Sequence, residues 1–152
     1  MIKMKHPVLT LGIWYWMLAH DSLGIVRISF LAAILHECGH ILAWILYKKS
    51  LPELSVSFYG ISMHMKQLDC TAGQELLLAT AGPCFNLLFA VFGWLLLLHK
   101  ASYWCWFFTV TNILMAGFNL LPVFQLDGKR IFACIKIILE RQRTNPKDVC
   151  NF

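Results

Sequence analysis

Two histidines and a glutamate lie close together in the middle of a long apolar segment, in the run His36-Glu37-Cys38-Gly39-His40. Residues four apart share one face of an α-helix, so His36 and His40 can reach one metal ion from the same side. Glu37 would lie beside that ion, where a carboxylate can take a proton from zinc-bound water and pass it to a leaving amine. This spacing is typical of zinc sites that activate water.

The segment that carries this motif, residues 22–47, is long and apolar enough to cross a membrane. Ionisable side chains within a membrane segment are costly and usually serve a function. A chance occurrence of the motif would leave three polar side chains in hydrocarbon without a purpose, so we favour a metal site. Cys38 would point away from the two histidines and is not counted as a ligand.

The composition indicates one membrane-embedded domain. Of the 152 residues, 59% are hydrophobic and only 14% are charged, which is too apolar for a soluble domain of this length. The net charge of +5 does not indicate a nucleic-acid partner, because the basic residues flank apolar segments and form no stripe with interleaved aromatics. The cysteines form no CxxC pair, so we expect them to be reduced.

Four apolar segments predict an all-α polytopic membrane protein with about four transmembrane helices. They cover residues 7–19, 23–47, 76–98 and 101–126, and the last three satisfy the length rule for a span. For the short first segment, an uncleaved first helix and a re-entrant or interfacial segment both stay open.

The basic residues predict how these segments are oriented. If the N-terminus is cytoplasmic, only Arg27 and Lys100 of the 13 lysines and arginines fall outside. This bias predicts a multi-pass protein of a bacterial cell membrane with both termini in the cytoplasm. It also places the zinc motif about 14 Å from the cytoplasmic end of its helix.

Two regions outside the apolar segments have patterns of their own. Residues 51–68 alternate in polarity around a break at Tyr59-Gly60, which predicts a small β-hairpin between the second and third spans. His64 in this stretch is expected to be a solvated strand residue. We expect residues 1–128 to form the membrane-embedded core and residues 129–152 to form a cytoplasmic amphipathic helix and tail, the helix lying on the anionic leaflet.

A catalytic zinc site normally has three protein ligands, so the two histidines need one more. Besides Glu37, the acidic candidates near the apolar segments are Asp21, Glu75 and Asp127. Asp21 lies at the far end of the first loop, and Glu75 suits a helix N-terminus. Asp127 follows a stretch made irregular by Pro122, and irregular backbone at membrane depth can line a site. From spacing alone, a third ligand and a solvated helix terminus are equally good interpretations of Asp127.

Three motifs together resemble the site-2 protease family of intramembrane zinc metalloproteases: HECGH at 36–40, AGPCFN at 81–86 and NLLPVFQLDG at 119–128. Their order and separation match the family, and the small size is closest to the sporulation-type and related bacterial branch that lacks PDZ domains. The resemblance implies that Asp127 is the third zinc ligand and that Glu37 is the catalytic acid/base. It also implies that Pro83 kinks the third helix and that Asn86 and Asn119 lie at the site and contact substrate.

Some features keep alternatives open. A purely structural role remains open for Asn86, as a satisfied amide in a kinked helix, and for Asn119, as a cap of the irregular segment. Gln125 and Lys129 depart from the family pattern, which often has proline and a second glycine there, and both can alter the local turn.

The predicted function is therefore an intramembrane zinc endopeptidase that holds one Zn²⁺ and cuts a membrane-spanning or membrane-tethered protein in the bilayer. The substrate must be extended first, and the 51–68 hairpin offers a strand edge for that. One alternative is a non-catalytic protein of the same fold that binds or sequesters a membrane partner, although the intact Glu37 argues against it. A metal-handling protein is a second alternative, but His20, His64 and His99 share no obvious face.

Overall fold

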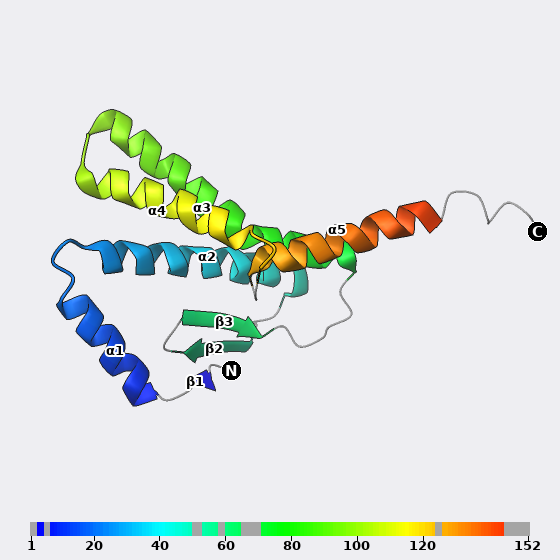
Figure 1. The fold of residues 1–152 in the computed structure, drawn as a ribbon, viewed down its shortest axis with the longest axis horizontal. Coiled ribbons are helices and arrows are strands. Elements are labelled where there is room, and N and C mark those ends of the chain that lie inside the picture. The colour runs from blue at the N-terminus through cyan, green and yellow to red at the C-terminus, as the bar shows by residue number, and fades with distance from the viewer. Residues whose placement is uncertain are drawn as a thin grey trace, which may run out of the picture.

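The computed structural model describes residues 3–4, 7–49, 53–57, 60–64, 71–123 and 126–144. These residues form five helices and three short strands (Figure 1). In chain order the elements are β1 (Lys3–Met4), α1 (Pro7–Ala19), α2 (Ile25–Lys48), β2 (Glu53–Ser57), β3 (Gly60–His64), α3 (Ala72–His99), α4 (Tyr103–Asn119) and α5 (Asp127–Thr144).

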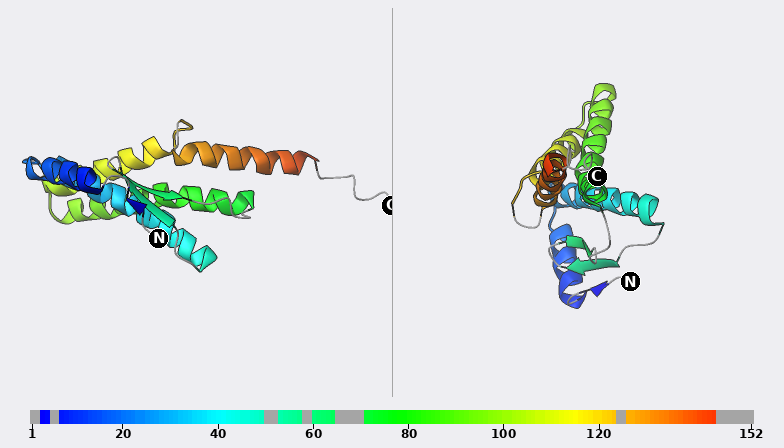
Figure 2. Two further views of the ribbon diagram at one scale, coloured as in Figure 1. Left: turned by 90° about the horizontal axis from the view of Figure 1, so that it is seen from below. Right: turned by 90° about the vertical axis from the view of Figure 1, so that its right-hand side faces the viewer.

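Helix α3 is the central element of the bundle, since it packs against α2, α4 and α5. Its C-terminal half pairs with α4 as a helical hairpin, and its N-terminal half lies alongside α5 (Figures 1 and 2). Helix α1 has few contacts with α2 and diverges from the bundle (Figure 1). The two helices that carry the predicted metal ligands, α2 and α5, are therefore both positioned by α3.

Small residues let α3 approach its neighbours closely. A Cβ atom added to Gly39 of α2 would lie 2.6 Å from the carbonyl oxygen of Ala81 in α3. A Cβ atom added to Gly93 of α3 would lie 2.5 Å from Oγ1 of Thr109 in α4. In a membrane the hydrophobic effect does not drive helices together. Small residues there let helices approach closely and associate through packing contacts.

The outer faces of the helices are strongly apolar. Helices α2 and α3, with 24 and 28 residues, are long and apolar enough to cross a membrane. Helices α1 and α4 have 13 and 17 residues and are shorter than the usual span. The count of four spans therefore stays a prediction. Large apolar side chains point outward along α3, among them Leu88, Val91, Phe92, Trp94 and Leu98.

Helix α4 ends at Asn119, so the apolar segment predicted over 101–126 is not one continuous helix. Pro122 explains the end, because proline has no N–H to donate and disfavours helical backbone in the residue before it. Residues 120–123 form turns, with the N–H of Leu121 bonded to the carbonyl of Phe118. The chain is helical again from Asp127. The irregular stretch before Asp127 is the one expected from Pro122.

The strands form one small sheet in the order β1-β2-β3. Strands β2 and β3 pair antiparallel from Glu53 opposite His64 to Ser57 opposite Gly60, within the stretch where a hairpin was expected. Strand β1 pairs parallel with β2 and was not foreseen from the sequence. Strand β3 is at the edge of this sheet and contacts α2, the helix with the two histidines.

The amphipathic helix predicted over 129–152 corresponds to α5, which begins two residues earlier, at Asp127. Its buried residues include Ile131 and Cys134, while Phe132 and Leu139 are exposed. Helix α5 runs in nearly the same direction as α4 and extends beyond the N-terminus of α3 (Figure 2). The predicted tail from residue 145 onward lies outside the described residues, and contact of α5 with a lipid leaflet stays a prediction.

Candidate metal centre

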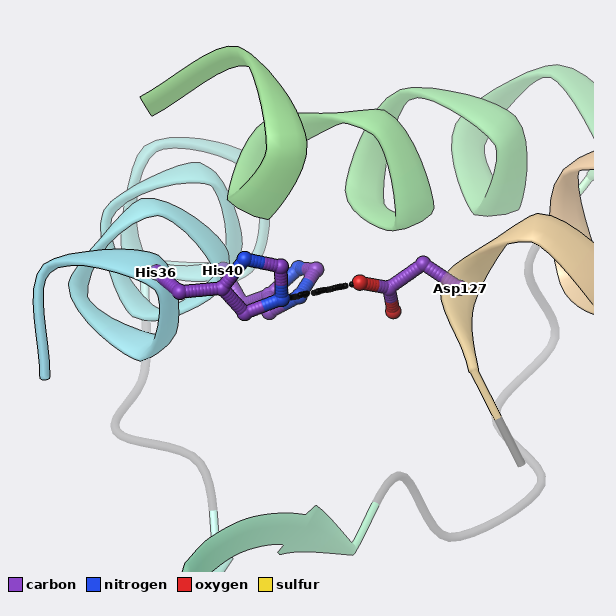
Figure 3. A group of neighbouring side chains, drawn as sticks. All are labelled: His36, His40 and Asp127. Atoms are coloured by element: carbon purple, nitrogen blue, oxygen red, sulfur yellow. Dashed lines mark hydrogen bonds and ion pairs between the residues drawn. The ribbon is translucent and has the colours of Figure 1, made fainter. Parts of the chain in front are cut away.

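Three buried side chains converge where α2, α3 and α5 meet: His36, His40 and Asp127 (Figure 3). Oδ2 of Asp127 lies 2.9 Å from Nε2 of His36 and 3.1 Å from Nε2 of His40. The two Nε2 atoms are 3.2 Å apart. The structure thus brings together the two histidines of the sequence motif and the aspartate that the family resemblance implied as their partner.

Helix periodicity positions the two histidines. The buried residues of α2 recur every four positions, in the series Ile28, Ala32, His36, His40 and Trp44. This series forms one face of the helix. Helix α2 packs against α3 and α4, and Asp127 of α5 meets this face at His36 and His40. The imidazoles are therefore enclosed because they lie on the packed face of α2, which is the face the motif spacing predicted.

Helix α3 provides a hydrogen-bond acceptor for Nδ1 of each imidazole, on the side away from Asp127. Nδ1 of His40 donates a hydrogen bond to the backbone carbonyl of Leu78 over 2.9 Å. Nδ1 of His36 lies 3.1 Å from Oδ1 of Asn86. A ring nitrogen that faces an acceptor must carry the proton, so in the neutral histidines each Nε2 presents a lone pair.

This arrangement fits a cation. Two lone pairs and a carboxylate oxygen within about 3 Å of one another repel unless a positive charge lies among them. Two imidazole nitrogens and one carboxylate oxygen are a ligand set of catalytic zinc sites, which leave a fourth position open. We conclude that His36, His40 and Asp127 could hold one Zn²⁺.

Gly82 forms the floor of this cluster. A Cβ atom at this position would lie 2.4 Å from Nε2 of His40 and 2.7 Å from Nε2 of His36, so no side chain fits. The role of Gly82 was not predicted from the sequence, although this residue lies within the AGPCFN motif, one turn before Asn86. Pro83 follows it inside α3, which continues through the proline to His99.

Asp127 is positioned by the start of α5. A Cβ atom at the next residue, Gly128, would lie 2.2 Å from the carbonyl oxygen of Leu120, so the first turn of α5 fits directly against the end of α4. Arg130 in the same turn forms an ion pair with Glu75 of α3, with Nε and Oε1 3.5 Å apart. Glu75 lies in the first turn of α3, as expected, and is not among the converging ligands.

The remaining predicted site residues lie around this cluster. Glu37 is half-buried on α2 and is not one of the three converging side chains, and its role as a base stays a prediction. Asn119 donates from Nδ2 to the carbonyl of Met115 over 2.9 Å, which is a bond within its own helix. Its contact with substrate stays a prediction. Asn86 is completely buried behind His36.

Asp21, the other acidic candidate, lies at the start of α2. Its Oδ2 accepts a hydrogen bond from the backbone N–H of Arg27 over 2.9 Å. Burial alone would raise the pKa of Asp21, but backbone N–H groups in the first turn of α2, chiefly that of Arg27, lower the pKa below its ordinary value. Asp21 therefore stabilises the N-terminus of α2 and is not one of the converging ligands.

Comparison with known proteins shows the fold. Neither a protein-family model nor a curated protein sequence matches the chain. A solved structure that matches is the site-2 protease from Methanocaldococcus jannaschii, with a TM-score of 0.65 and 22% sequence identity, over 93% of this chain and 68% of that chain. The chain therefore has the fold of a site-2 protease, as the three motifs predicted.

Proposed function

We propose that this chain is a zinc endopeptidase of the site-2 protease family that cuts a membrane-spanning or membrane-tethered protein within the bilayer. A fold alone does not specify an activity, so the proposal depends on the site. The observation that carries it is the convergence of His36, His40 and Asp127, in a chain with this fold.

The ligands and the base have separate tasks in this proposal. His36, His40 and Asp127 would hold Zn²⁺, which would supply polarisation of the scissile carbonyl and a lowered pKa of water. Glu37 takes a proton from the attacking water and later gives one to the leaving nitrogen. Glu37 follows His36 directly on α2 and is not one of the three converging ligands, which is consistent with a base that acts beside the metal.

The surroundings of the site support a location in the membrane. Helices α2 and α3 have the length and composition of spans, and large apolar side chains cover the outside of α3. The charge distribution favours a multi-pass bacterial membrane protein with four spans and both termini in the cytoplasm. Water and substrate would then reach the metal centre from the cytoplasmic side.

The small sheet suggests how a substrate is held. Peptide bonds in a helix are shielded by their own hydrogen bonds, so the substrate segment must be extended before it is cut. Strand β3 has one edge unpaired within the described sheet and contacts α2, the helix that carries both histidines. An extended substrate segment can pair with this edge as an added strand beside the metal centre.

The test is to separate metal binding from catalysis. The chain is co-expressed with a panel of single-span reporter proteins, and the products are identified by mass. We expect Glu37→Gln to abolish cleavage and to leave zinc content unchanged, because the base is lost and the ligands remain. Glu140→Gln on α5, away from the site, is the matched control and should cleave normally.

Cleavage by the Glu37→Gln variant would remove Glu37 from the mechanism. A wild-type chain that holds zinc but cuts no reporter would favour the non-catalytic alternative, in which the same fold binds a membrane partner.

A further inference from the structure

The amide of Asn86 links two successive turns of α2 from the α3 side. Oδ1 lies 3.1 Å from Nδ1 of His36, and Nδ2 donates to the carbonyl of Ala32 over 3.4 Å. Ala32 is one helical turn before His36. The side chain of Asn86 is completely buried, so its two polar atoms face these two partners and not solvent.

The partners fix which way the amide points. The carbonyl of Ala32 can only accept a hydrogen bond, so the NH₂ group of Asn86 must face it. Oδ1 then faces His36 and can only accept, so Nδ1 of His36 must carry the proton. A reversed amide would place two acceptors against each other at Ala32. The order of donors and acceptors thus runs from Ala32 through Asn86 to His36 and leaves Nε2 of His36 free to bind metal.

The two histidines differ in the group that accepts the hydrogen bond from Nδ1. The acceptor for Nδ1 of His40 is the backbone carbonyl of Leu78, which no side-chain substitution removes. The acceptor for Nδ1 of His36 is the Asn86 side chain. Leu78, Gly82 and Asn86 are spaced four apart, so they lie on one face of α3 and together form the surface behind both imidazoles.

We infer that Asn86 is a positioning residue that fixes the tautomer and the ring orientation of His36 for metal binding, and that it does not contact substrate. This inference rests on the proposed function, since it concerns the same metal centre. Complete burial places the amide behind the histidine and away from any surface that a substrate could reach. Groups that orient a metal-binding histidine in this way typically contribute about 10–100-fold to metal affinity.

The experiment measures zinc affinity of the full chain in detergent, by competition with a chelator of known affinity. Asn86→Leu removes both hydrogen bonds at similar volume, and we expect zinc affinity to fall about 10–100-fold. Asn86→Asp keeps an acceptor for Nδ1 of His36 but loses the donor to the carbonyl of Ala32, so zinc affinity should fall clearly less than in Asn86→Leu.

Asn112→Leu is the matched control. Asn112 is also completely buried, but its Nδ2 donates to the carbonyl of Phe108 on its own helix. This variant should bind zinc as wild type does, although it loses an equally buried amide.

A second readout does not depend on zinc. Nitrogen-15 spectra of the metal-free, histidine-labelled chain report the tautomer of each ring. We expect the Nδ1–H form of His36 in the wild type and in Asn86→Asp, and a mixture of tautomers in Asn86→Leu. If Asn86→Leu does not fold, the folded Asn86→Asp variant decides, and loss of the Nδ1–H form there would overturn the inference.

The outcomes separate this inference from the proposed function. Equal zinc affinity in the wild type and in Asn86→Leu would overturn the role of Asn86 and leave the protease intact. Unchanged zinc affinity with a raised KM would assign Asn86 to substrate binding. A wild-type chain that binds no zinc would contradict the proposed function, while the tautomer spectra would still test Asn86.

Discussion

His36 and His40 reach the candidate metal centre from one helix, whereas Asp127 reaches it from the start of another helix, 87 residues beyond His40. The relative position of the two histidines follows from the period of α2 alone. The position of Asp127 depends on the irregular residues after α4 and on the packing of α5 against α3. One part of the site is set by local structure and the other by tertiary contacts.

This difference predicts unequal responses to substitution. Changes in α3 behind the histidines act on both imidazoles at once and should affect the whole site. Changes at the start of α5 should move Asp127 and leave the two imidazoles in place. The predictions that follow test this contrast through zinc affinity, from the largest expected effect to the smallest.

Gly82→Ala should have the largest effect. The new Cβ atom would lie 2.4 Å from Nε2 of His40 and 2.7 Å from Nε2 of His36, so both imidazoles must turn away from the metal position. We expect zinc binding to be lost. Helix stability does not explain such a loss, because alanine favours a helix over glycine by about 1 kcal/mol.

Gly117→Ala is the control for Gly82→Ala. Gly117 also lies within a helix, and nothing lies within 4 Å of its Cβ position. This variant should bind zinc normally. Normal zinc affinity in Gly82→Ala would mean that α3 can move away from α2, and that the close fit of Gly82 against the imidazoles does not determine their position.

Gly128→Ala should have an intermediate effect. Its Cβ atom would lie 2.2 Å from the carbonyl oxygen of Leu120, so the first turn of α5 must shift and move Asp127 with it. Overpacking typically costs about 1–3 kcal/mol, which corresponds to a fall in zinc affinity of roughly 5- to 150-fold. The neighbouring exposed residue serves as control, and Lys129→Ala should leave zinc affinity unchanged.

The tautomer spectrum of the histidines distinguishes the two halves of the site. In Gly128→Ala the Nδ1–H forms of His36 and His40 should persist, since their partners on α3 are untouched. A changed spectrum in this variant would show that the position of Asp127 also determines the histidine pair.

The contrast between local and tertiary positioning also explains which parts of the site could be predicted from the sequence. The pair His36 and His40 could be predicted because four-residue spacing on a helix is a local property. For Asp127, spacing left two interpretations open, and only the family resemblance favoured a ligand. The apolar segments predicted the helices well, except that α4 stops at Asn119, before Pro122.

Other features could not be predicted because they depend on packing between distant segments. The contact between Gly82 and the imidazoles joins positions on two helices that periodicity treats separately. The pairing of β1 with β2 involves two residues at the N-terminus, which are too few to show a pattern. The enclosed position of Asn86 likewise required the arrangement of α2 against α3.

Loss of the ion pair between Glu75 and Arg130 should have the smallest effect. The pair joins α3 to the first turn of α5, but its side chains are 45% and 29% exposed, so water and salt screen it. Partly exposed pairs contribute at most about 1 kcal/mol, and Glu75→Gln should therefore weaken zinc binding no more than about fivefold. The double variant Glu75→Arg/Arg130→Glu should recover part of that loss, and 1 M salt should remove the difference from wild type. If Glu75→Gln weakened zinc binding as much as Gly128→Ala, α5 would be held chiefly by charge and not by its close fit against α4. The third ligand would then respond to ionic strength, while the histidine pair would not.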